Sequence, residues 1–169
     1  MKRLHLKSKV FFSIVFSTVF GILTGCRSFQ AIAPPILPGG INSNFPEESP
    51  AYSSDGKYLV FASDRRGQRD IFLYDVSQKQ LVSLPNLNHG NSSQDKPAIN
   101  ANGRYIVYVS TERGKADIFL YDRQQKKAEL LSANIKGSVD NPTINGDGSQ
   151  IAFQASQTGQ WKIVLVNRL

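Results

Sequence analysis

The sequence of 169 residues contains one cysteine and two histidines, His5 and His89. One cysteine cannot form an internal disulfide, and zinc sites need clusters of Cys and His that the chain does not have. His5 lies in an amino-terminal targeting segment, so His89 is the one candidate for a catalytic base, and its polar neighbours favour a solvated loop histidine. The sequence therefore predicts no metal and no cofactor.

Catalytic and calcium-binding motifs are also missing from the sequence. The chain has no G-x-S-x-G, the nucleophile motif of α/β-hydrolases. Residues 147–149 (Asp-Gly-Ser) resemble part of a calcium loop, but the related tripeptides at 55–57 and 102–104 indicate a repeated hairpin turn, and the distal Glu of an EF-hand is absent. We therefore expect a protein without enzymatic activity.

No apolar run is long enough to span a bilayer. The longest, residues 10–23, falls short of the roughly 20 residues that a spanning helix needs. Four basic residues precede it, and a basic segment followed by a short apolar one is typical of a secretory signal peptide. Without those four the net charge falls from +7 to +3, with 16 basic against 13 acidic residues. No aromatic residues alternate with the arginines, so the sequence does not predict a nucleic-acid partner.

The apolar run ends in Leu23-Thr24-Gly25-Cys26, which resembles the bacterial lipobox. The resemblance implies that residues 1–25 are cleaved off and that Cys26 is acylated, and two or three acyl chains on one residue suffice for stable anchoring. The alternative is an incidental or buried thiol in an uncleaved anchor. We expect a mature protein that is tethered to the membrane through Cys26.

Residues 26–47 form the second segment of the chain. They are rich in proline and glycine between positions 34 and 46 and show no hydrophobic period, which predicts an extended linker. Scattered apolar residues such as Ile36 and Ile41 leave a second interpretation. In it, part of the linker packs as an added strand on an open sheet edge.

Residues 48–169 contain three copies of one pattern. Copies 48–94 and 95–139 align without a gap at a spacing of 47 residues, and copy 140–169 follows at a spacing of 45. Each copy starts with an acidic residue two positions before a proline and continues through an Asp-Gly or Asn-Gly turn. The first two copies also share the motif D-I-F-L-Y-D. So many matches in register indicate structural repeats.

Each copy predicts a series of short β-strands. The Asp-Gly or Asn-Gly turn is a strong hairpin signal, and runs that are apolar on both faces indicate sheets packed on both sides. A weak fourth strand closes only the first two copies. The expected strands are 51–53, 58–63, 70–75 and 80–84 in the first copy, 98–100, 105–110, 117–122 and 128–131 in the second, and 143–145, 151–155 and 162–167 in the third.

The repeated pattern resembles the WD-like propeller repeat of the TolB family over residues 48–169. The resemblance implies an all-β fold, a partial β-propeller of three four-stranded blades with the last blade incomplete, preceded by the signal peptide and the Pro/Gly-rich tether. TolB itself pairs a six-bladed propeller with an amino-terminal α/β domain, whereas this sequence shows three repeats and a lipobox.

Two sets of residues are candidates for partner contact. The first is the acidic residue before each repeat proline, which the resemblance places near the channel mouth: Glu48, Asp95 and Asp140. Such residues either accept backbone N–H bonds or form a polar ring that meets a peptide or a small ligand. The second set lies in the turns between the second and third strands, where a charged residue either contacts a partner or stays solvated. Its members are Asp64, Arg65, Arg66, Arg69, Glu112, Arg113 and Lys115.

These features predict a non-enzymatic envelope lipoprotein whose repeats bind another protein as a scaffold. The alternative is an accessory module that binds a saccharide or a peptide for a separate enzyme. Arg27 follows Cys26 where an Asp would favour inner-membrane retention, so we expect the periplasmic face of the outer membrane of a Gram-negative-type bacterium. Because a propeller ring takes about four to eight blades, we also expect a homodimer that completes a six-bladed ring.

Overall fold

A computed structural model describes residues 30–168 of the chain. The predicted signal peptide, residues 1–25, and the predicted lipidation site Cys26 lie outside the described residues. The sheets all belong to one compact unit, Ala33–Leu169. Among residues 30–168, no helix is long and apolar enough to cross a bilayer.

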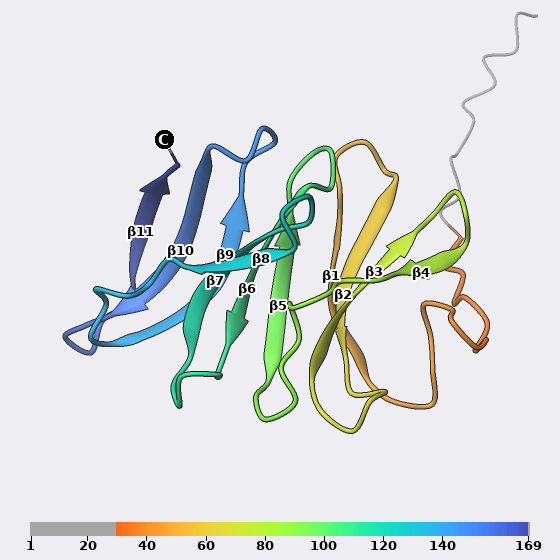
Figure 1. Ribbon diagram of the computed structural model, residues 1–169, viewed down its shortest axis with the longest axis horizontal. Coiled ribbons are helices and arrows are strands. Elements are labelled where there is room, and N and C mark those ends of the chain that lie inside the picture. Colours follow the sequence, from red (N-terminus) through yellow and green to blue (C-terminus); the bar gives the residue numbers. More distant parts are fainter. Residues whose placement is uncertain (1–29, 169) are drawn as a thin grey trace, which may run out of the picture. The chain divides into compact units, whose positions relative to one another are not determined.

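Three antiparallel sheets, one per sequence copy, make up the described part of the chain (Figure 1). Within each sheet the strands pair in chain order, and we call the sheets blade 1, blade 2 and blade 3. Blade 1 consists of β1 (Glu47–Tyr52), β2 (Tyr58–Ser63), β3 (Asp70–Asp75) and β4 (Gln80–Val82). Blade 2 consists of β5 (Gln94–Ile99), β6 (Tyr105–Ser110), β7 (Asp117–Asp122) and β8 (Lys127–Leu130), and blade 3 of β9 (Ser138–Ile144), β10 (Gln150–Ser156) and β11 (Lys162–Asn167).

The expected all-β architecture, with a third blade that lacks its fourth strand, is confirmed. The first strand of each blade begins four or five residues earlier than predicted, because it continues past the repeat proline through a bulge. The residue before each proline has a positive φ: 53° at Ser49, 49° at Lys96 and 48° at Asn141. A proline cannot donate to the ladder, and the bulge lets the strand pair on both sides of it.

Neighbouring blades stack face to face through apolar side chains. Successive residues of a strand point to opposite faces, so each interior blade contributes two apolar faces. At the first interface, Val60, Ile71 and Leu73 of blade 1 pack with Ile106, Tyr108, Phe119 and Tyr121 of blade 2. At the second interface, Val107, Ile118 and Leu120 of blade 2 pack with Ile151, Phe153, Val164 and Val166 of blade 3.

The repeated hairpin glycines close these interfaces at one end. Gly148 of blade 3 has a φ of +79°, and a Cβ there would lie 2.6 Å from the ring of Tyr105 in blade 2. Gly103 of blade 2 approaches Tyr58 of blade 1 in the same way. Only glycine allows both the left-handed backbone and this close approach. The turns at Gly103 and Gly148 therefore serve blade packing as well as the hairpin.

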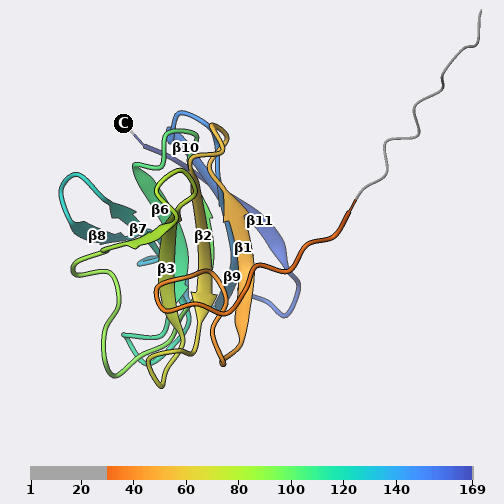
Figure 2. The same cartoon turned by 90° about the vertical axis from the view of Figure 1, so that its right-hand side faces the viewer.

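Part of the predicted linker packs on the outer face of blade 1. Ile41 packs against the cluster of Leu59, Phe61 and Phe72, and Arg65 donates to the carbonyl oxygens of Gly40 (2.9 Å) and Ile41. The segment before β1 crosses the face of blade 1 in Figure 2. Residues 30–46 add no strand to the blade, so the contact is made by side chains and carbonyl groups.

Candidate functional site

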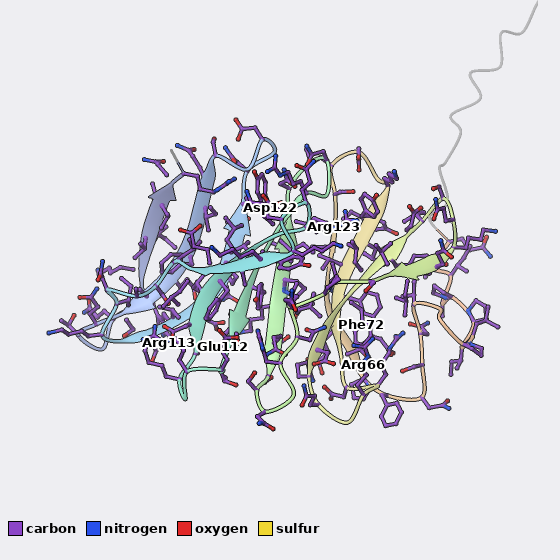
Figure 3. The ribbon with its side chains drawn as sticks, in the orientation of Figure 1. Arg66, Phe72, Glu112, Arg113, Asp122 and Arg123 are labelled. Atoms are coloured by element: carbon purple, nitrogen blue, oxygen red, sulfur yellow. The ribbon has the colours of Figure 1, made fainter. Side chains whose placement is uncertain are left out.

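The candidate contact residues gather at one end of the blades, which we call the rim. In Figure 3, Arg66, Glu112 and Arg113 lie along the lower side of the molecule, whereas Asp122 and Arg123 lie near the opposite end. The rim consists of the β2–β3, β6–β7 and β10–β11 turns and the starts of β1, β5 and β9. Its charged side chains are Glu48, Asp64, Arg66, Arg69, Asp95, Lys96, Glu112, Arg113, Lys115 and Asp140.

Arg69 links blade 1 to blade 2 at the rim. Its Nη1 lies 2.8 Å from Glu48 Oε2, and its Nε lies 2.6 Å from Asp64 Oδ1. The same Nη1 lies 3.7 Å from Asp95 Oδ2 in the next blade. Hydrogen bonds from Arg69 lower the pKa of Glu48, and the bonds to Glu48 and Asp64 raise the pKa of Arg69. Arg69 is therefore held by carboxylates as a charged bridge between two blades.

Lys96 makes the corresponding link between blades 2 and 3. Its Nζ lies 2.7 and 2.6 Å from the two carboxylate oxygens of Asp140. The backbone N–H of Lys96 donates to Asp95 at 2.7 Å, and that of Asn141 donates to Asp140 at 2.9 Å. Asp95 and Asp140 thus stabilise their bulges and also face cations of the preceding blade.

The bulges themselves line an open hollow of about 260 Å³ between the three innermost strands. It is formed by the same two positions of each repeat, the positive-φ residue and the proline after it. This hollow is the part of a central channel that three blades provide. Its lining residues are Ser49, Pro50, Lys96, Pro97, Asn141 and Pro142.

Three basic side chains of the rim reach solvent. Arg66, Arg113 and Lys115 have side chains that are 64%, 46% and 44% exposed. Each is anchored by an acid at the start of the third strand of its blade: Lys115 lies 2.6 Å and Arg113 3.6 Å from buried Asp117, and Arg66 lies 3.9 Å from Asp70. The anchored side chains keep donors free to contact another molecule.

Arg65 does not join this group. Its side chain is 12% exposed, and its guanidinium lies over the rings of Phe61 and Phe72 at 5.2 and 4.8 Å. Besides the carbonyl groups of residues 40 and 41, it donates to Glu47 Oε1 at 2.9 Å. The residue that sequence reasoning placed among the contact candidates thus fastens the linker to blade 1.

A model of the TolB beta propeller domain matches residues 41–168. The chain belongs to this TolB propeller family. No curated protein sequence gives a significant match.

Solved structures share the TolB propeller fold with this chain. TolB from Acinetobacter baumannii superposes with a TM-score of 0.61 and 18% identity, over 74% of this chain and 30% of that one. A protein assigned as TolB from Agrobacterium tumefaciens gives 0.63 and 19%, over 75% and 47%. An oligogalacturonate lyase from Vibrio parahaemolyticus gives 0.53 and 16%, over 73% and 39%. At these identities the likeness shows the fold alone, and this TolB propeller chain spans less than half the length of each of the three proteins.

Two rim residues of this TolB propeller were missed by sequence reasoning. Lys96 stands between an acid and a proline, where only the alignment with Ser49 and Asn141 marks it as unusual. Trp161 occupies the third-copy position of Arg69 and Ala116 and is 51% exposed.

His89, interpreted as a solvated loop histidine, has a half-exposed side chain and lies 3.2 Å from Glu112. Within residues 30–168, no group of three or more His, Cys, Asp or Glu is arranged to hold a metal.

Proposed function

We propose that this TolB propeller module binds another protein of the cell envelope and acts as a scaffold without catalysing a reaction. The observation that carries the proposal is the rim, where exposed charged side chains of both signs gather from neighbouring blades. Arg66, Arg113 and Lys115 are each oriented by an internal acid, so less conformational entropy is lost when a partner binds them. Pre-oriented arginines are common anchors at protein interfaces.

A second candidate function is an accessory module that binds a saccharide or a peptide for a separate enzyme. The hollow between the innermost strands favours it, because its volume of about 260 Å³ suits a small polar group. The mixed charges of the surrounding rim extend well beyond that hollow and favour the larger contact area of a protein.

The function is tested by capture from detergent-solubilised envelope with the full, lipidated chain as bait. We expect defined proteins to be enriched, and we expect the triple variant Arg66→Glu, Arg113→Glu, Lys115→Glu to lose them. The matched control is Lys126→Glu, Lys127→Glu, which changes exposed lysines at the end of the β7–β8 turn and the start of β8, at the other end of blade 2. Equal capture by all three baits, or recovery of glycan without protein, would overturn the proposal.

We also propose that Cys26 carries the lipid that tethers the module to the periplasmic face of the outer membrane. The lipobox supports this, and so does the exposure of the linker, in which Ile32, Ile36 and Leu37 are 77%, 59% and 57% exposed. Mass spectrometry of the amino-terminal peptide should find Cys26 acylated, and Cys26→Ala should move the protein to the soluble fraction. A free amino terminus upstream of Cys26 would contradict both expectations.

Self-association is proposed through the outer face of blade 3. Ile163 and Leu165 are 66% and 71% exposed there, although the equivalent Ile118 and Leu120 of blade 2 are buried by the next blade. Closure of a six-bladed ring would also require residues 40–46 to leave the outer face of blade 1. Sedimentation of Cys26→Ala protein should show a dimer that Ile163→Glu, Leu165→Glu dissociates. A monomer at high concentration would exclude the dimer.

A further inference from the structure

The two interfaces between blades differ at one repeat position on the rim. At the first interface this position is Arg69, whose side chain lies among Glu48, Asp64 and Asp95. The alignment of the copies puts Ala116 at the same position of the second interface. A methyl group therefore stands where the preceding interface has a guanidinium group.

The acids that face this position are largely retained at the second interface. The equivalents of Glu48 and Asp95 are Asp95 and Asp140, and only the equivalent of Asp64 has lost its charge, as Thr111. All three line a hollow of about 310 Å³ beside Ala116. The space that Arg69 fills at the first interface is thus open at the second.

Of the two acids that line this hollow, Asp95 is paired less closely than Asp140. Lys96 holds Asp140 through both carboxylate oxygens, whereas Asp95 accepts a backbone N–H on one oxygen and has Arg69 3.7 Å from the other. The Asp95 and Asp140 side chains remain 32% and 29% exposed. The lining itself carries two carboxylates and one ammonium. The nearby guanidinium of Arg69 is already paired with Glu48 and Asp64, so the charge around the hollow is net negative and favours a cation.

The indole of Trp161 completes the lining. It is half exposed, comes from the β10–β11 turn and lines the hollow together with residues from the start of β5. An arginine can bond a carboxylate with its planar fork while its guanidinium stacks on an aromatic face, a combination that lysine matches less well. Carboxylates and an indole together therefore select a guanidinium group.

We propose that this hollow binds an arginine side chain of a partner protein, in the position that Arg69 occupies at the first interface. The inference rests on the proposed protein-binding function and names the chemistry of the partner, an exposed arginine in a segment that reaches the rim. The chain itself provides the model for the contact, because Arg69 shows how equivalent residues hold a guanidinium.

The test uses acetyl-Gly-Arg-Gly-amide as the probe and tryptophan emission as the readout, since Trp161 is the one tryptophan of the chain. We expect a saturable change in emission with the full chain in detergent. The citrulline peptide, which is neutral and nearly isosteric, should give no change over the same range, and the lysine peptide should bind at least fivefold more weakly. Equal binding of the citrulline peptide, or preferred binding of acetyl-Gly-Glu-Gly-amide, would overturn the proposal.

Two variants and one control show whether the probe binds in this hollow. Ala116→Arg should fill the hollow from within and abolish the response, whereas Gln124→Arg, an exposed control in the β7–β8 turn, should keep it. Asp140→Asn should weaken binding at least fivefold without adding a side chain to the hollow. A response that survives in Ala116→Arg overturns the proposal.

If envelope proteins are captured equally by the native chain and by Ala116→Arg, this inference fails while the proposed function stands. If the peptide binds but no envelope protein is captured, the proposed function fails while the hollow still binds arginine.

Discussion

Blades 1 and 3 each have one apolar face without a neighbouring blade, and the two faces differ in how well they are covered. On blade 1, the face that points away from blade 2 is closed: Leu59, Phe61 and Phe72 are 6%, 2% and 6% exposed. On blade 3, the face that points away from blade 2 is open, and Ile163 and Leu165 remain largely exposed. The strands behind the two faces belong to the same repeat, so the difference comes from outside the repeat or from substitutions within it.

On blade 1 the cover comes from the chain before the repeats. Ile41 packs on the aromatic cluster, and Arg65 lies over Phe61 and Phe72 while it bonds Glu47 and the linker carbonyls. A segment of a few residues thus replaces the preceding blade. Repeat proteins generally need such terminal caps, since an end repeat lacks one neighbour.

On blade 3 the change lies in the sequence of the repeat itself. Gln150 stands at the position of Tyr58 and Tyr105, and Gln154 at the position of Ala62 and Val109. Both glutamines make this face more polar than the interior interfaces. The outer face of blade 1 is thus sealed by packing, whereas the outer face of blade 3 is polar enough to remain in contact with water or to bind elsewhere.

The largest expected effect is the difference in unfolding free energy between truncations on the two outer faces. Phe61→Ala should lower the free energy of unfolding by about 3–5 kcal/mol, because it removes a buried ring and leaves a cavity. Ile163→Ala should cost less than about 1 kcal/mol, because that side chain is already solvated. Urea denaturation of the two variants measures both values. Similar costs would show that the two faces do not differ in the way described.

The next prediction concerns the cap. Arg65→Met keeps an apolar side chain over the rings but removes every donor, so Glu47 loses its charged partner and two carbonyl groups lose a donor. We expect a loss of about 2–3 kcal/mol, as for other largely buried ion pairs that lose one member. Arg66→Met is the matched control, since Arg66 also lies over Phe72 but is exposed, and it should change stability by about 0.5 kcal/mol or less. Equal effects in the two variants would argue against a cap held by Arg65.

Much of the fold was predictable because it repeats. The second and third strands of blades 1 and 2 have the predicted bounds, since their apolar runs and turn glycines recur in register. The first strands were predicted too short, because a proline normally ends a strand and the bulge before it requires positive φ at Ser49, Lys96 and Asn141, residues whose type does not demand it.

The candidate site was only partly predictable. The acids Glu48, Asp95 and Asp140 were found because they recur, and the structure brings each of them near a cation. The role of Arg65 could not be read from its turn, since its partners lie about 24 residues away in a segment with no period. Long-range contacts outside the repeat leave no pattern in one sequence.

The first hairpins of blades 1 and 3 differ in how closely they pack on a neighbouring blade. Gly56 and Gly148 both have positive φ, but a Cβ at Gly56 meets nothing within 4 Å, whereas one at Gly148 would clash with Tyr105. Gly56→Ala should therefore cost about 1–2 kcal/mol from backbone strain alone. Gly148→Ala should cost roughly 1 kcal/mol more, because the Tyr105 ring must shift. Thermal unfolding of both variants tests the difference, and equal costs would show that the hairpin of blade 3 does not pack closely on blade 2.

The smallest effect is the pH dependence of the cap on blade 1. Burial alone would raise the pKa of Glu47, but hydrogen bonds from Ser43, Arg65 and Ser63 outweigh it and hold the pKa below the ordinary value of 4.5. A carboxyl whose pKa is lowered on folding adds stability above its unfolded pKa and loses that contribution as the pH falls through its folded pKa. Native protein should thus lose stability relative to Glu47→Gln as the pH falls below about 4.5, measured by urea midpoints from about pH 6 to pH 3.

The control for this titration is Glu129→Gln, an exposed change on β8 of blade 2, which should follow the native curve throughout. Blade 3 carries no equivalent of Glu47 and its partner Arg65, because Val139 and Gln157 stand at their positions in the third copy. Lowering the pH should therefore weaken the contact between the preceding segment and blade 1 before it affects the outer face of blade 3. Parallel curves for native protein and Glu47→Gln would show that this carboxyl does not hold the cap.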